Sequence, residues 1–102
     1  MNNTIDIAKK QMLRRQVLIL CNELKEVGAG VPLICMVLNK QNIVCTEKEI
    51  ADACYYLQGK KLIDFKHYRN DVADIERDIS FITSDGIDVL EGTTAIDGIA
   101  LR

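Results

Sequence analysis

The order of structural signals in residues 46–92 constrains the fold more than any other feature of this chain. Thr46 and Glu49 form a capping box, in which the two side chains satisfy backbone N–H groups at the start of a helix. A segment with the composition of two paired strands, residues 62–83, comes next. Ser84 is then placed to open another helix. The order helix, β-hairpin, helix predicts a mainly α-helical domain with a small β-hairpin.

The bounds of these elements follow from the caps and from the turn-forming residues. The first helix is predicted over residues 46–58 and the last over residues 84–91, and each is followed by a glycine suited to end it. The two strands are expected at Leu62–Tyr68 and Asp78–Thr83. The polar stretch Arg69–Glu76 is then expected to be a loop.

A long N-terminal helix is predicted over residues 3–27. Apolar side chains recur at helical spacing along one of its faces, at Leu13, Val17, Leu20, Cys21 and Leu24. A second apolar set nearer the N-terminus exceeds what a small core requires and consists of Ile5, Ala8, Met12 and Ile19. A homodimer interface through this helix and packing within one chain both remain open.

A short second helix is predicted over residues 32–40, after a glycine-rich break. Pro32 suits its first position, because the missing N–H of proline has no partner there in any case. The run Leu33–Leu38 has no polar interruption, so a buried strand is the competing interpretation. The tail, residues 93–102, shows no clear period, and it either packs as an arm or frays.

Composition favours one globular domain over residues 1–102, because 48% of the residues are hydrophobic. The longest largely apolar run, Val31–Leu38, is far shorter than the roughly 20 residues that cross a bilayer. No basic-then-apolar segment opens the chain, as it would in a secretory signal. We therefore expect a soluble cytoplasmic protein that does not contact membranes.

The four cysteines are spread too widely to indicate a structural zinc site. No pair has the short spacing that lets two ligands share a turn, and His67 is the only histidine. Each cysteine has apolar neighbours, so buried, reduced thiols are expected. The chain has neither a Ser/His/Asp set nor a glycine-rich phosphate loop. We expect no metal, no cofactor and no enzymatic activity.

Two segments resemble the winged helix-turn-helix family. Ile50-Ala51 through Leu57, continued by Gly59-Lys60-Lys61-Leu62-Ile63, is similar to the end of the family's recognition helix and the entry into its wing. Ile79-Ser80-Phe81-Ile82-Thr83-Ser84-Asp85-Gly86-Ile87-Asp88-Val89-Leu90-Glu91 resembles the strand-to-helix segment Leu-Thr-x-x-Gly-x-x-x-Leu of small bacterial and phage PadR-, MarR- and YjcQ-like proteins. Together the segments cover roughly residues 43–92. In one departure, Lys61 stands where the family usually has glycine before Leu-Ile.

The resemblance implies a small DNA-binding transcriptional regulator that acts as a homodimer on double-stranded DNA. In that family the third helix enters the major groove, and the wing contacts the backbone or the minor groove. Carried over by position, the candidates for the major groove are Lys48, Asp52, Tyr55 and Tyr56. The candidate phosphate contacts are Lys60, Lys61, Lys66, His67, Arg69 and Arg77.

The charge of the chain keeps a second function open. It has 13 basic and 15 acidic residues and a pI near 5.3, whereas affinity for DNA depends largely on Lys and Arg neutralising phosphates. In the recognition-type helix, Glu47, Glu49 and Asp52 outnumber Lys48. The alternative is therefore an acidic winged-helix domain used for protein–protein interaction or assembly without DNA binding.

Overall fold

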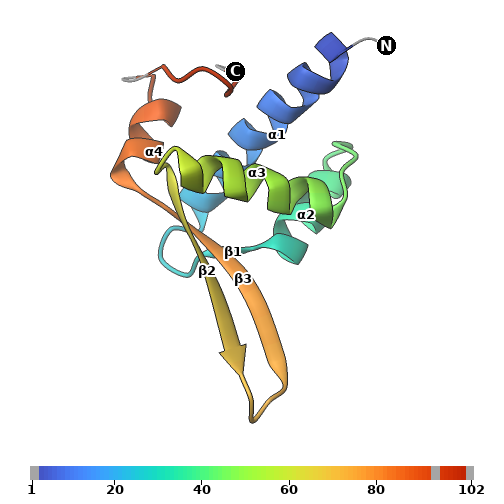
Figure 1. Ribbon diagram of the computed structural model, residues 1–102, viewed down its shortest axis with the longest axis vertical. Helices are drawn as coiled ribbons and strands as arrows, with labels where there is room; N and C mark the ends of the chain where they lie inside the picture. Colours follow the sequence, from blue (N-terminus) through green and yellow to red (C-terminus); the bar gives the residue numbers. More distant parts are fainter. Residues whose placement is uncertain (1–2, 93–94, 101–102) are drawn as a thin grey trace.

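The computed structural model describes residues 3–92 and 95–100, and its β-hairpin projects from a body formed by the helices (Figure 1). Within these residues no helix is both long enough and apolar enough to span a membrane. In chain order the elements are α1 (Asn3–Glu23), β1 (Ala29–Gly30), α2 (Val31–Lys40), α3 (Glu47–Gly59), β2 (Ile63–Asn70), β3 (Ile75–Ile82) and α4 (Ser84–Leu90).

The sheet has three strands, in the order β1-β3-β2, and every pairing is antiparallel. The prediction of a two-stranded wing was therefore wrong in strand number. Ala29 and Gly30 pair with Ser80 and Ile79 of β3. Alanine and glycine both have low strand propensity, so this strand exists only because β3 lies beside it. The sequence shows the same residues as a break between two helices.

The hairpin lies within the predicted residues 62–83, but its two strands are longer than predicted. Its ladder runs from Ile63↔Ile82 to Asn70↔Ile75, so most of the stretch expected to be a loop is paired strand. The turn is short because the side-chain oxygen Oδ1 of Asn70 accepts hydrogen bonds from the backbone N–H groups of Val72 and Ala73, each at 3.1 Å. Polar residues form strands here because this ribbon has solvent on both faces and needs no apolar alternation.

Helix α1 ends at Glu23 rather than at residue 27, because the chain turns sharply at Gly28. The Gly28 N–H donates to the Leu24 carbonyl at 2.7 Å, and Gly28 has a φ of 82°, in the left-handed region that favours glycine. A Cβ atom there would also lie only 2.8 Å from the Phe81 ring. This turn therefore places β1 directly against β3.

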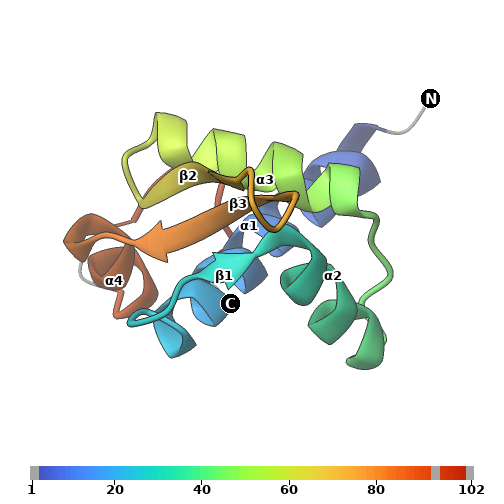
Figure 2. The ribbon, with the colours of Figure 1, turned by 90° about the horizontal axis from the view of Figure 1, so that it is seen from below.

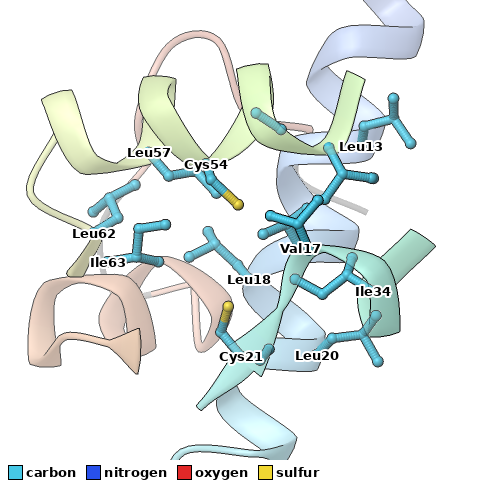
Figure 3. Packing of buried hydrophobic residues seen from close by; sticks show 14 of the residues in the cluster. Leu13, Val17, Leu18, Leu20, Cys21, Ile34, Cys54, Leu57, Leu62 and Ile63 are labelled. Atoms are coloured by element: carbon cyan, nitrogen blue, oxygen red, sulfur yellow. The ribbon is translucent and has the colours of Figure 1, made fainter. Parts of the chain in front are cut away.

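The core fills the space between α1, α2, α3 and the base of the wing. Figure 3 shows side chains from these elements converging, including Leu13, Val17, Leu18, Leu20, Cys21, Ile34, Cys54, Leu57, Leu62 and Ile63. Cys54 hydrogen-bonds to the buried Ser80 hydroxyl across 3.2 Å. Burial raises the pKa of Cys21 to about 12 and that of Cys54 to about 11. Both thiols therefore stay protonated near neutral pH.

The cap of α4 differs from the prediction, and the structure decides between the two alternatives left open for the tail. Helix α4 is capped by Thr83 and not by Ser84, because the Thr83 hydroxyl accepts from the Gly86 N–H at 3.2 Å. Of the tail, residues 95–100 pack as an arm on α1 and bury Ile99. The Ala100 N–H donates to the Gln11 carbonyl at 3.3 Å. The rest of the predicted tail, residues 93–94 and 101–102, lies outside the described residues.

The backbone at Lys61 shows why glycine suits this position. The φ of Lys61 is 63°, a conformation that glycine adopts without strain. A side chain in this region costs roughly 1–2 kcal/mol, while glycine adds less than about 1 kcal/mol of unfolded-state entropy. We expect Lys61→Gly to raise the free energy of unfolding by about 0.5–1 kcal/mol in urea denaturation. Lys60→Gly removes the same charge at a φ of −89° and should lower it. Equal effects of the two substitutions would contradict this explanation.

Candidate nucleic-acid interface

The open face of α3 carries three of the four residues predicted to face the major groove. Lys48 and Asp52 form an exposed ion pair one helical turn apart, with Nζ and Oδ2 separated by 3.1 Å. Tyr55 is 62% exposed, and its ring meets the edge of Phe65 at a centroid distance of 5.1 Å. Because Phe65 belongs to β2, this contact fixes the wing against the exposed face of the helix.

Tyr56 lies on a different side of α3 and ties the helix to α1 and to the tail. The guanidinium of Arg14 lies 3.5 Å from the centre of its ring, and the Tyr56 hydroxyl donates to the Asp97 carbonyl at 3.2 Å. Arg14 also donates to the Gly98 carbonyl at 2.8 Å. One helical step of about 100° separates Tyr55 from Tyr56, and this turns the second ring towards the protein. Tyr56 therefore anchors the tail instead of lining the open face.

Two basic side chains of the wing, His67 and Arg69, are paired with acids of the same hairpin. His67 Nδ1 lies 2.6 Å from Asp78 Oδ1 across the two strands. Arg69 Nε lies 2.7 Å from Asp71 and 3.5 Å from Glu76. These exposed pairs sit in the turn and on one face of the ribbon, where a cross-strand pair of opposite charge such as Arg69 and Glu76 stabilises strand pairing by a few tenths of a kcal/mol. A phosphate that binds either base must compete with a carboxylate already in place.

Lys66 extends along the wing rather than across to an acid. Its ammonium nitrogen lies 5.6 Å from the centre of the Phe81 ring, within the range of a cation–π interaction. Such a contact leaves the ammonium hydrated and positively charged. Lys66 is therefore placed to reach an anion without first breaking an ion pair of the hairpin.

A groove of about 790 Å³ separates the helices from the wing. Figure 2 shows the hairpin turn facing the viewer, with α3 above it and α2 beside it. The start of α2 contributes two exposed apolar side chains, Leu33 (41% exposed) and Met36 (51%). The charged residues that line the groove comprise three acids and two bases, namely Glu47, Glu76, Asp78, Lys48 and Arg77. Lys48 and Arg77, predicted separately, are thus brought to one surface that is acidic overall.

The remaining predicted phosphate contacts lie at the other end of α3. Lys60 caps that helix, and Lys61 is the first residue of the turn into β2. With a rise of 1.5 Å per residue, Lys60 lies roughly 18 Å along the axis from Lys48. The Lys60 ammonium lies 5.7 Å from the Tyr56 ring. Lys48 and the pair Lys60 and Lys61 therefore lie at opposite ends of the recognition-type helix.

Asn39 fixes the turn between α2 and α3, and sequence reasoning did not identify it. Its Nδ2 donates to the carbonyls of Cys35 (2.9 Å) and Cys45 (3.0 Å), and its Oδ1 accepts from the Cys45 N–H at 3.2 Å. The turn leads directly into the capping box of Thr46 and Glu49. A hydrogen bond from Lys9 is the main cause that lowers the pKa of Glu49 below its usual range. One predicted acid of α3 is therefore occupied by the cap and by α1.

The residues predicted for a dimer interface divide into two pairs. Ile5 is 67% exposed and Ala8 is also exposed, on the part of α1 that projects beyond the body (Figure 1). Met12 is half-buried and packs against the chain's own core, and Ile19 is half-buried as well. Only the N-terminal pair therefore presents a surface that a second chain can cover.

The apolar side of the groove was also missed by sequence reasoning. Leu33 and Met36 belong to the uninterrupted apolar run 33–38, which exceeds what one buried helix face requires. Ile34 and Leu38 are the members of this run that are fully buried. The excess of apolar residues on a short helix is the sequence signal from which an exposed apolar strip could have been predicted.

The architecture defines a winged-helix protein. No protein-family model matches the sequence, and no curated protein matches it. Among solved structures, an X-ray structure of a PadR-like transcription factor from Bacteroides fragilis aligns with a TM-score of 0.74. The alignment covers 90% of this chain and 85% of that chain at 17% identity. The fold is therefore winged-helix and PadR-like, which confirms the resemblance inferred from residues 43–92.

Proposed function

We propose that this chain is a DNA-binding transcriptional regulator that acts as a homodimer. The observation that carries the proposal is the match to a PadR-like transcription factor over 90% of the chain. The open face of α3 supports it, because Lys48 and Tyr55 protrude from a helix whose opposite face is buried. In this function the protein binds and releases DNA without catalysing a reaction.

The arrangement of charge suggests how such binding works. Four exposed bases are available to contact phosphates: Lys60 and Lys61 at the end of α3, and Lys66 and Arg77 on the wing. They can reach the phosphates on both sides of the DNA major groove, while Tyr55 contacts base edges or sugars between these phosphates. The acids that line the protein's own groove, Glu47, Glu76 and Asp78, disfavour non-specific contact with phosphates. We therefore expect weak binding to random sequences and a larger advantage for one particular site.

The projecting half of α1 supports the homodimer. Ile5 and Ile7 are 67% and 52% exposed, although both are large apolar residues on a helix. A second copy related by a two-fold axis would cover the same surface on both chains. It would also place two α3 helices on one duplex, as palindromic sites require.

A salt titration of binding to duplex DNA tests the proposal. With four bases from each of two chains, log Kobs should fall against log[salt] with a slope of about −7. The complex should contain two chains per duplex, as measured by sedimentation of the same samples. Absence of binding to a library of random duplexes at low salt would contradict the proposal, because non-specific phosphate contact is strongest there.

The groove favours a second candidate function, recognition of another protein. It combines exposed apolar residues of α2 with the acids Glu47, Glu76 and Asp78. A basic, amphipathic segment of a partner would complement both features. Such a partner would occupy the side of α3 that the DNA-binding proposal assigns to the duplex, so the two functions exclude each other at this surface.

A further inference from the structure

Cys35 and Cys45 form a thiol pair at the joint between α2 and α3. The Cys35 thiol donates to the Cys45 carbonyl at 3.4 Å. The Asn39 amide nitrogen lies 3.3 Å from the Cys35 sulfur and 3.8 Å from the Cys45 sulfur. One side-chain nitrogen thus contacts both sulfur atoms, which brings the two thiols to the same turn although they are ten residues apart in the sequence.

This pair differs from the other two cysteines in its access to solvent. Cys21 and Cys54 are both completely buried, at 0% exposure. Cys45 is buried as well, but Cys35 is only half-buried, contrary to the expectation that all four thiols are buried. Cys35 is partly accessible because it lies on the flank of α2 that faces the turn, where its thiol contacts the Cys45 carbonyl. Small polar molecules can therefore reach one thiol of the pair but neither of the core thiols.

We propose that Cys35 and Cys45 are a redox switch, which hydrogen peroxide or another small hydroperoxide closes to an intramolecular disulfide. Its regulatory consequence rests on the proposed function, because the joint that it alters leads directly to the cap of α3. Formation of the bond itself does not depend on what the protein binds.

With hydrogen peroxide as the oxidant, the reaction proceeds in two balanced steps. The Cys35 sulfur attacks one oxygen of the peroxide, the O–O bond breaks, and the departing hydroxide takes the thiol proton to form water. The Cys35 sulfenic acid that results is attacked by the Cys45 sulfur, and hydroxide leaves with the Cys45 proton as a second water. Two thiols are oxidised by two electrons, and one peroxide is reduced to two waters.

The disulfide changes the joint because its geometry differs from that of the reduced pair. A disulfide needs an S–S distance of about 2.05 Å, so the sulfurs must move together and the contacts of the Asn39 amide with both sulfurs must change. Asn39 also holds the backbone N–H and carbonyl of Cys45. Thr46, the cap of α3, is the next residue. Oxidation therefore breaks the Asn39 hydrogen bonds that hold the backbone just before the recognition-type helix.

Thiol counting after peroxide treatment tests the bond. We expect the denatured, oxidised protein to show two alkylatable thiols in place of four, with a mass lower by about 2 Da, and to recover all four after reduction. Peptide mapping should join residues 35 and 45. Cys35→Ser and Cys45→Ser should each keep three thiols and lack the change of about 2 Da. Four persistent thiols, a bond between other cysteines, or a bond between two chains would overturn the proposal.

Two readouts test the consequence for α3. Hydrogen exchange at the amides of Thr46 and Glu49 should become at least threefold faster on oxidation of the wild type, and should stay unchanged in Cys45→Ser. Affinity of the same samples for DNA should fall at least threefold on oxidation. If the disulfide forms but the exchange rates do not change, the switch is refuted. If the reduced protein binds no DNA, the proposed function fails, while thiol counts and exchange rates still decide the switch.

Discussion

Replacing Gly86 with alanine is expected to lower the free energy of unfolding by about 2–3 kcal/mol. Gly86 lies in the first turn of α4, where a Cβ atom would overlap the Leu62 carbonyl oxygen and lie 2.8 Å from Cγ1 of Ile82. That carbonyl accepts a hydrogen bond from the Thr83 N–H at 3.0 Å. It cannot move away without losing the bond that joins the entry of the wing to its exit. Urea denaturation at 25 °C measures the loss.

Gly59→Ala is the matched control for this substitution. Gly59 is also a helical glycine, but a Cβ atom there would meet nothing within 4 Å. This variant should gain about 0.4–1 kcal/mol, because alanine restricts the unfolded chain and favours helix. Opposite signs for the two variants would establish that the close approach of α4 to Leu62 is the cause. Similar small effects would show that α4 shifts without cost.

Reversing the charge at the end of α3 should have the largest effect on DNA binding. Lys60→Glu/Lys61→Glu replaces four positive charges of a homodimer with four negative ones next to the phosphates. Removing four contacts should make the slope of log Kobs against log[salt] shallower by about 3.6. Affinity at low salt should fall at least a hundredfold. Fluorescence anisotropy with a labelled duplex measures both quantities.

Lys25→Glu/Lys40→Glu supplies the same change of net charge elsewhere. Lys25 lies in the turn after α1 and Lys40 at the end of α2, and both are exposed. This control separates local contact from the long-range effect of net charge, so its slope should stay near that of the wild type. Helix content by circular dichroism should be unchanged in both double variants. If the two variants lost affinity equally, Lys60 and Lys61 would not be phosphate contacts.

Elements that depend on neighbouring residues were predicted well from the sequence. The capping box of Thr46 and Glu49 has the expected hydrogen bonds, because both partners lie within one helical turn of each other. Pro32 lies in the first turn of α2, so the competing interpretation of that run as a strand was wrong. The apolar spacing of α1 gave Leu13, Val17 and Cys21 as core residues, and all three are buried.

Features that depend on distant residues were not predictable in this way. Strand β1 forms only against β3, about fifty residues later in the chain. The tyrosines at 55 and 56 look equivalent in the sequence, but the second is occupied by Arg14 and by the carbonyl of Asp97. The wing's positive charges could be counted, whereas their pairing with acids depends on strand register.

The succession of capped helices and hairpin could be predicted from the sequence, because caps, periodicity and turns are interactions between residues close along the chain. Tertiary structure alone decided which charges share the groove between α3 and the wing and which two thiols meet at Asn39. Burial, charge pairing and reactivity depend on distances through space, and only the packing of α1, α2 and α3 around their common core fixes those distances.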